Sequence, residues 1–288
     1  MSDTPIIPGL AALAPRYDVL VCDIWGVVHN GRGAFPGVVD CLKRFRRDRG
    51  VVLLLSNAPR PNGPIRDQLS GLGVPADAYD ALVTSGDLTR QLMAERAPLN
   101  LHHVGPDRDL PLFEGLHVSR VAMAQAQAIV CTGPFDDTTE GPDDYRDYWQ
   151  DALERKLPFY CANPDLVVQR GDQLIYCAGA LAQGYEQQGG HVVYLGKPHL
   201  PVYDFVERHL AHLTGRTIPR AKWLAVGDGL KTDIEGAKRA GIDALLITGG
   251  IHEPELSGSD GAPDPAKIAA VLAAQGLSAV AAMRRLVW

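Results

Sequence analysis

Short apolar runs, rich in leucine and β-branched residues, alternate along the chain with longer stretches of helical periodicity. The runs lie at 18–23, 51–55, 81–84, 223–226 and 244–247, and polar or glycine-containing turns bound them. Apolar runs of this length are typical of strands that are buried on both faces of a parallel sheet. Helical patterns fall near 36–48, 61–72, 200–213 and 230–240, and the last closes with the stop signal Ala240-Gly241. The alternation predicts an α/β fold with a doubly wound parallel sheet of right-handed βαβ units.

A segment with its own elements interrupts this series. It has strand-like pieces at 102–104, 128–131 and 159–161, and helical patterns near 141–156 and 175–188. We therefore expect a smaller α/β cap at 87–186, inserted into a core formed by 1–86 and 187–288. The acidic, aromatic stretch from Asp136 to Trp149 predicts an amphipathic cap helix with a solvated face. The alanine- and leucine-rich sequence from Pro265 predicts helices that pack on the core.

Composition narrows the class of protein. The 288 residues suffice for a full core, and 46% hydrophobic and 22% charged residues are ordinary for a globular protein. A net charge of −6 without a basic stripe argues against nucleic acid as a partner. Five cysteines without paired short spacing favour reduced thiols. We find no signal-peptide pattern and no run of membrane-spanning length, so we expect a cytoplasmic protein without membrane contact.

Polar side chains follow three of the predicted strands. Asp23 opens the string Asp23-Ile24-Trp25-Gly26-Val27-Val28, Ser56-Asn57 follows the second run, and Gly227-Asp228 follows the run at 223–226. In open α/β sheets, ligands bind outside the carboxyl ends of the strands, so these side chains are expected to share one crevice. Ser and Asn are also common turn residues, and acids are common near helix N-termini, so each string alone is weakly specific.

Lys197, in Leu195-Gly196-Lys197-Pro198, adds a cation to this set. A carboxylate can attack phosphorus only when a metal and a cation offset the charge, and these residues together offer both. The lysine string is not a nucleotide-binding P-loop, because His191 stands where the first glycine is needed and Pro198 where Ser or Thr should bind Mg²⁺.

Taken in this order, the four strings resemble the haloacid dehalogenase (HAD) superfamily of Mg²⁺-dependent phosphatases, in the branch with a large cap between the second and third motifs. The nearest likeness is to the nitrophenyl-phosphatase and sugar- or pyridoxal-phosphatase group. It is carried by Asn163-Pro164-Asp165, Cys177-Ala178-Gly179-Ala180-Leu181, Gly196-Lys197-Pro198, and Gly227-Asp228 through Thr232-Asp233-Ile234. The resemblance covers nearly the whole chain and implies an enzyme, a phosphoric monoester hydrolase.

The resemblance also implies roles for the phosphoryl site. Asp23 is expected to attack phosphorus and form an aspartyl-phosphate. Ser56, Asn57 and Lys197 are expected to hold the phosphoryl group. In the cap, Asn163 and Asp165 resemble the substrate-facing part of the family, which predicts substrate contacts there. Relatives with such caps often self-associate, so a homo-oligomer through the cap is consistent with the resemblance.

The expected metal is Mg²⁺, with Asp23, Asp228 and the backbone carbonyl of residue 25 as ligands and Asp233 as an outer-shell anchor. At position 25 most phosphatases of the family carry an aspartate that serves as general acid and base, but here it is Trp25. The carbonyl role survives this change. Proton donation does not, because an indole N–H does not titrate usefully, and such catalysis is typically worth about 10² to 10⁴ in rate.

Three histidines are candidates to replace the missing acid: His29, His199 and His252. The leading hypothesis is a phosphatase that acts on a small phosphorylated metabolite. The alternative is a catalytically impaired phosphometabolite-binding or regulatory protein, for which Trp25 is the main support. Carbon–halogen hydrolysis needs neither acid nor metal, and the metal carboxylate Asp228 weighs against it.

Overall fold

The computed structural model describes residues 4–170 and 173–288. Its contacts divide the chain into two compact units. The first comprises Met1–Ser56, Ile65–Val83 and Tyr203–Trp288, and the second Asn57–Pro64 and Thr84–Val202. The predicted cap, 87–186, lies within the second unit, which also contains 57–64, 84–86 and 187–202. A specificity role for 87–186 stays a prediction.

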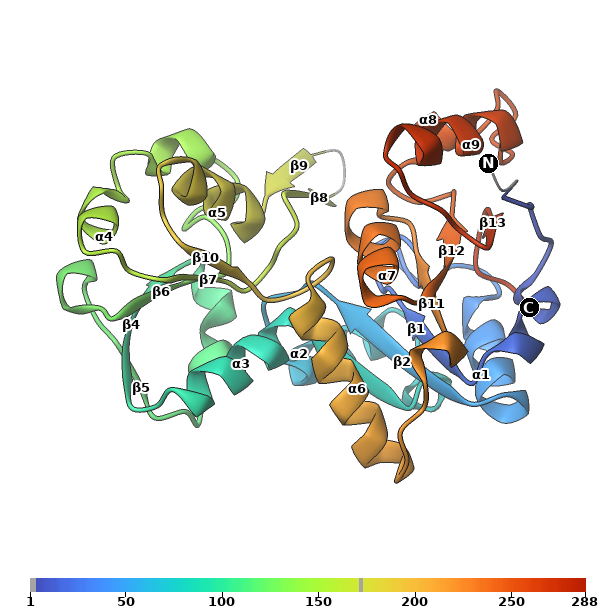
Figure 1. Ribbon diagram of the computed structural model, residues 1–288, viewed down its shortest axis with the longest axis horizontal. Coiled ribbons are helices and arrows are strands. Elements are labelled where there is room, and N and C mark those ends of the chain that lie inside the picture. The colour runs from blue at the N-terminus through green and yellow to red at the C-terminus, as the bar shows by residue number, and fades with distance from the viewer. Residues whose placement is uncertain (1–3, 171–172) are drawn as a thin grey trace. The chain divides into compact units, whose positions relative to one another are not determined.

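The first unit is built on a six-stranded sheet in the order β13-β12-β11-β1-β2-β3 (Figure 1). The strands are β1 (Val19–Cys22), β2 (Val51–Ser56), β3 (Ala81–Thr84), β11 (Trp223–Gly227), β12 (Asp243–Ile247) and β13 (Ala281–Met283). The pairings from β13 through β2 are all parallel. The predicted α/β class with a doubly wound parallel sheet is therefore confirmed. The prediction of helices from Pro265 onward is wrong beyond Pro265–Ala274, because β13 follows; its two alanines and a methionine carry little strand signal.

The register of this sheet brings three polar strings to the same level. Cys22, the last residue of β1, pairs with Leu54 on one side and Val226 on the other. Asp23 continues the ladder by donating its N–H to the carbonyl of Val226 at 2.8 Å. Strand order reverses at β1, since the chain leaves it for β2 on one side while β11 lies on the other. Such a switch point is where open α/β sheets bind ligands.

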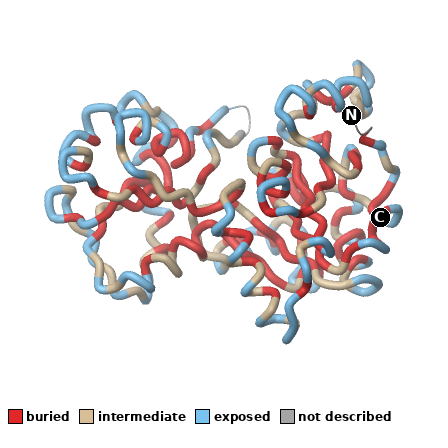
Figure 2. The backbone as a smooth tube through the Cα atoms, viewed as in Figure 1, coloured by how far each residue is buried: buried red, intermediate tan, exposed pale blue. Residues whose placement is uncertain are grey.

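Helices complete the first unit, and all its central strands are buried (Figure 2). They are α1 (Val38–Asp48), the greater part of α2 (Asn62–Gly71) and of α6 (Leu200–Thr214), α7 (Glu235–Ala240), α8 (Glu253–Leu256) and α9 (Pro265–Ala274). The helix predicted near 230–240 begins as a π-type turn at Leu230–Ile234 and continues as α7. It ends at Gly241, whose φ of +67° is the left-handed value that the stop signal requires.

The second unit has a five-stranded parallel sheet in the order β10-β7-β6-β4-β5, with an antiparallel hairpin of β8 and β9. The strands are β4 (Leu99–Val104), β5 (Val118–Arg120), β6 (Ala128–Cys131), β7 (Phe159–Cys161), β8 (Val167–Arg170), β9 (Gln173–Tyr176) and β10 (Val192–Tyr194). Its helices are α3 (Ser85–Glu95), α4 (Gln150–Glu154) and α5 (Ala178–Gln187). Over the described residues 4–170 and 173–288, no helix is both long and apolar enough to cross a bilayer.

Two predicted helices of this unit need correction. The stretch 141–156 is not one helix but a 3-10 turn at Pro142–Tyr145 followed by the short α4. The Tyr145 hydroxyl donates to Glu140 at 2.5 Å and accepts from the Phe135 N–H at 2.7 Å, which ties the turn to the preceding loop. Trp149 is fully buried, so this stretch contributes to the core. The helix predicted at 175–188 begins only at Ala178, because its first residues form β9.

Candidate functional site

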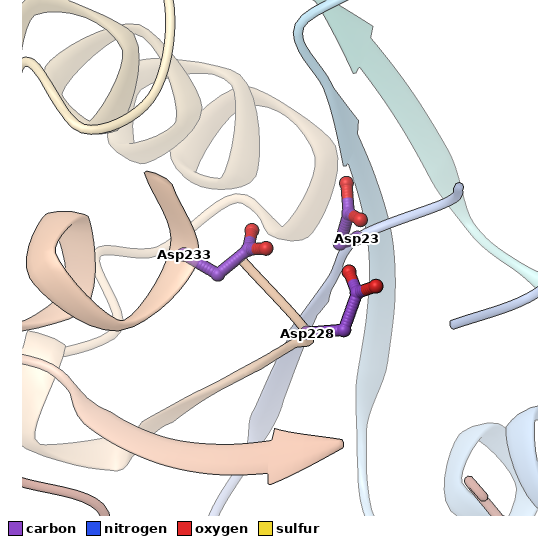
Figure 3. A group of neighbouring side chains, drawn as sticks. All are labelled: Asp23, Asp228 and Asp233. Atoms are coloured by element: carbon purple, nitrogen blue, oxygen red, sulfur yellow. The ribbon is translucent and has the colours of Figure 1, made fainter. Parts of the chain in front are cut away.

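Three carboxylates gather at the carboxyl edge of the first sheet. Asp23, Asp228 and Asp233 each place one oxygen within 4.8 Å of the others. Asp228 and Asp233 are buried and Asp23 is half-buried. Figure 3 shows Asp23 beyond the end of β1, Asp228 just after β11, and Asp233 on the helical segment that follows. We call these three residues the acidic cluster.

Glycines allow the chain to approach Asp228 closely. A Cβ on Gly26, whose φ is +82°, would lie 2.2 Å from one Asp228 carboxylate oxygen, and a Cβ on Gly250 would lie 1.9 Å from the same oxygen. The Ile251 N–H donates to that oxygen at 2.7 Å. Two loops that are far apart in the sequence thus hold the Asp228 carboxylate in place. Any side chain at either glycine would displace it.

Asp233 is bound to its own loop. One of its carboxylate oxygens accepts the Gly229 N–H at 3.0 Å, and its backbone N–H donates to the Gly229 carbonyl at 2.8 Å. A Cβ on Gly227 would lie 2.1 Å from the Asp233 Cβ, so the residue after the apolar part of β11 must also be small. These contacts hold Asp233 beside the turn that carries Asp228.

Like-charged carboxylates at this separation repel one another unless a cation lies between them. An all-oxygen ligand set suits a hard divalent ion such as Mg²⁺ better than Zn²⁺. Both Asp228 and Asp233 also accept backbone N–H groups, as the carboxylates around protein-bound metals usually do. The residues present therefore fit a Mg²⁺ site.

Residues 23–34, which we call the nucleophile loop, place Trp25 against His29. The two rings meet edge to face with centroids 5.1 Å apart, and a Cβ on Gly31 would lie 2.5 Å from the indole. The indole remains 37% exposed, whereas His29 is buried. Gly31 donates its N–H to His29 Nδ1 at 3.0 Å. Burial lowers the pKa of His29 to about 4, so at neutral pH its ring is uncharged and has no surplus proton to donate.

The other two candidate histidines have partners of their own. The His199 ring stacks on Tyr194 with centroids 4.6 Å apart, in the second unit. His252 lies in the first unit at the N-terminus of α8, where its Nδ1 is 3.3 Å from a Glu255 carboxylate oxygen. A role for either ring as the general acid stays a prediction.

In the second unit, the Asn57 side chain binds both sides of the Lys197 backbone. Its Oδ1 accepts the Lys197 N–H at 2.8 Å and the Ser85 hydroxyl at 3.3 Å. Its Nδ2 donates to the Lys197 carbonyl at 3.0 Å and to Asp165 Oδ1 at 2.9 Å. An amide has only two N–H donors, and both are used here. The side chain of Asn57 is thus arranged to hold Lys197 in place, a role that sequence reasoning missed.

Gly196 and Asn163, which lie close to Lys197 and Asp165 in the sequence, add contacts in the same region. Gly196 has no room for a Cβ, which would lie 2.2 Å from the Ser85 hydroxyl and 2.6 Å from Asn57 Oδ1. The Asn163 side chain accepts the Asp165 N–H at 3.1 Å and so closes its own turn. Asn163 thus closes its loop, Asp165 also binds Asn57, and the predicted substrate contacts of both residues stay a prediction. Ser56 lies half-buried at the end of β2, in the first unit.

Ser85 was also absent from the sequence-based set of residues. It is the first residue of α3, whose N-terminus is fixed by a capping box: Thr84 accepts the Asp87 N–H, and Asp87 accepts the Thr84 N–H at 3.0 Å. The spacing Thr-x-x-Asp after an apolar run is a helix-start signal and could have located this residue.

Replacing Asn57 by alanine is expected to lower the free energy of unfolding by about 1 to 3 kcal/mol, because the buried backbone N–H and carbonyl of Lys197 lose their hydrogen bonds to the Asn57 amide. Ser85→Ala is the matched control, since it removes only the 3.3 Å bond to the same amide. Urea unfolding followed by circular dichroism measures both. Equal decreases in the free energy of unfolding of the two variants would contradict the role of Asn57 in holding the Lys197 backbone.

Comparison with known proteins identifies the family to which the chain belongs. The model of haloacid dehalogenase-like hydrolases matches residues 20–119, and a HAD-hydrolase-like model matches residues 194–274. A crystal structure of a haloacid dehalogenase-like hydrolase from Brucella suis is 42% identical, covers 98% of this chain and 100% of its own, and superimposes with a TM-score of 0.85. The chain belongs to the haloacid dehalogenase-like hydrolase family.

More distant relatives of this HAD hydrolase are named phosphatases. The D-glycerol 3-phosphate phosphatase of Mycobacterium tuberculosis is 26% identical over 84% of this chain, which spans 66% of that protein. The ribonucleotide monophosphatase NagD of Escherichia coli is 26% identical over 81% of this chain and 88% of its own length. The predicted likeness to the capped HAD phosphatases, and the predicted hydrolase class, are confirmed.

Proposed function

We propose that this HAD hydrolase is a Mg²⁺-dependent phosphatase that acts on a small phosphorylated metabolite through an aspartyl-phosphate. The acidic cluster carries the proposal, because three carboxylates within 4.8 Å at a switch point suit a divalent cation beside a nucleophile. Phosphatases of this superfamily typically use a divalent metal, and relatives are named for small phosphate esters. We further propose a cytoplasmic location, and self-association through 87–186 stays a prediction.

Asp23, Asp228 and the Trp25 carbonyl would hold the metal, with Asp233 as the outer-shell anchor. Its attachment to the Gly229 N–H supports that role for Asp233. When bound, the cation supplies the charge that lets an anionic nucleophile meet an anionic phosphoryl group.

The chain's own residues carry the bond changes. One carboxylate oxygen of Asp23 forms a bond to phosphorus, while the bond from phosphorus to the leaving oxygen breaks and its electrons go with the leaving group. Water then attacks the aspartyl-phosphate, which releases inorganic phosphate and restores the carboxylate. Ser56 and the ammonium of Lys197 would hold the phosphoryl oxygens. Asn57 would act by fixing the Lys197 backbone, which its two hydrogen bonds to that backbone support.

Trp25 would set the limits of this chemistry. Its indole cannot give the leaving oxygen a proton, and His29, its ring neighbour, is uncharged at neutral pH. Leaving groups of low pKa, such as aryl oxides and carboxylates, would depart readily and alkoxides slowly. The same observation favours a second candidate, a protein that binds phosphometabolites and turns them over poorly.

The test is hydrolysis of para-nitrophenyl phosphate, acetyl phosphate, glycerol 3-phosphate and a ribonucleotide monophosphate with Mg²⁺ and with EDTA. Release of phosphate is expected with Mg²⁺, at rates that follow leaving-group acidity, and EDTA is expected to abolish it. Full activity in EDTA after dialysis would rule out the metal. Binding of these esters without turnover would favour the second candidate.

A further inference from the structure

Arg285 lies just beyond β13 and covers the end of the nucleophile loop. Its guanidinium carbon is 4.0 Å from the centroid of the Phe35 ring, which is the distance of a close cation–π stack. Phe35 directly follows the loop and donates its N–H to the Val28 carbonyl at 2.9 Å. A displacement of the Phe35 ring would therefore be transmitted to the loop that begins with Asp23.

The guanidinium also lies close to the turn at 249–251, which seats Asp228. A Cβ on Gly249 would lie 3.1 Å from the Arg285 guanidinium carbon, and the next residue, Gly250, lies against the Asp228 carboxylate. The Gly249 N–H donates to the Arg284 carbonyl at 3.0 Å, so turn and arginine segment are joined through the backbone. The positive guanidinium and the Asp228 carboxylate attract each other. One side chain thus lies beside both Phe35, which follows the nucleophile loop, and the turn at 249–251 that seats Asp228.

Its polar contacts are not those of an ordinary surface arginine. Nη1 of Arg285 is buried and has no hydrogen-bond partner among the residues that the structure describes. Its nearest carboxylate, Glu253, is 4.0 Å away, whereas Arg284 approaches the same carboxylate at 3.0 Å and is half-exposed. A buried donor without a partner is costly and needs a compensating reason. The stack on Phe35 is such a reason, because it uses the planar face of the guanidinium rather than its N–H groups.

We propose that Arg285 is a positioning residue that holds the nucleophile loop against the turn at 249–251 and so fixes the spacing of Asp23 and Asp228. This inference rests on the proposed function, since that spacing matters because both carboxylates bind the metal. The Phe35 ring and the Arg285 guanidinium, which are far apart in the sequence, form this contact, and we call the pair the clamp. Small misplacements of reacting groups cost large factors in rate, up to about a hundredfold for 1 Å.

The experiment compares Arg285→Met, Arg285→Lys and the control Arg284→Met by calorimetric titration with Mg²⁺ and by kcat and KM for para-nitrophenyl phosphate. Methionine removes the planar cation, and lysine keeps the charge without the planar face. Both Arg285 variants are expected to bind Mg²⁺ roughly tenfold more weakly and to lose roughly tenfold in kcat, with KM changed less than about twofold. Arg284→Met is expected to match wild type.

Phe35→Leu removes the same cation–π contact by changing the ring instead of the arginine. It tests the proposal even if an Arg285 variant does not fold. Its loss is expected to be similar, and the double variant Phe35→Leu/Arg285→Met should lose no more than either single variant, as for residues of one contact. Wild-type behaviour of Arg285→Met, rescue by Arg285→Lys, or additive losses would each overturn the clamp. Failure of the wild type to bind Mg²⁺ would instead overturn the proposed function.

Discussion

Asp23→Asn is expected to abolish turnover, with kcat falling by at least about 10³-fold on every substrate. An amide oxygen is a poor nucleophile for phosphorus, so the aspartyl-phosphate would not form. The change also removes one anionic ligand from a cluster whose members lie within 4.8 Å of one another, so Mg²⁺ binding should weaken. Steady-state kinetics and calorimetric titration with Mg²⁺ measure the two effects separately.

Thermal unfolding in EDTA separates lost chemistry from lost structure in this variant. Removing one of three neighbouring negative charges relieves repulsion, so Asp23→Asn should melt no lower than wild type without metal. Wild type should gain more stability from added Mg²⁺ than the variant does, because a ligand of the folded state alone stabilises it by mass action. Substantial turnover by a well-folded Asp23→Asn would remove Asp23 from the role of nucleophile.

Trp25→Asp is expected to raise kcat/KM for alkyl phosphates such as glycerol 3-phosphate by about 10² to 10⁴, the usual worth of a positioned general acid. For para-nitrophenyl phosphate the gain should be much smaller, because that leaving group departs without a proton. The fold should tolerate the change, since Trp25 is 37% exposed and its indole contacts His29 and lies beside Gly31 within the nucleophile loop.

Trp25→Asn is the matched control, because asparagine has the size of aspartate but no group that can act as a general acid or base near neutral pH. Rates for a series of esters, plotted against leaving-group pKa, should show a steep slope for wild type and Trp25→Asn and a shallow one for Trp25→Asp. Equal gains in both variants would mean that the indole blocks the site sterically rather than leaving it without an acid. Activity that appears only in Trp25→Asp would favour the binding protein as the native function.

The sequence alone predicts that the three residues of the acidic cluster lie together. Asp23 and Asp228 each follow a buried strand, and parallel strands bring such ends to one edge of the sheet. Asp233 follows five residues after Asp228, close enough for one turn to bring them together. Local patterns were less reliable where tertiary contacts decide: Tyr145 bonds to the preceding loop, which replaced an expected helix with a 3-10 turn.

The order of apolar runs and polar strings was sufficient for the fold class and the family, because strand ends and motif types are local properties of the chain. The chemical roles of the residues at those strand ends stay a proposal. The contacts that those residues make could not be predicted in this way. Asn57 meets Lys197 across 140 positions, and Phe35 meets Arg285 only because β13 joins the same sheet as β1. Hydrogen-bond partners and ring contacts depend on how separate segments pack, and no local pattern encodes that distance. Only the tertiary structure showed that the Asn57 side chain binds the Lys197 backbone and that Arg285 lies beside Phe35 and Gly249.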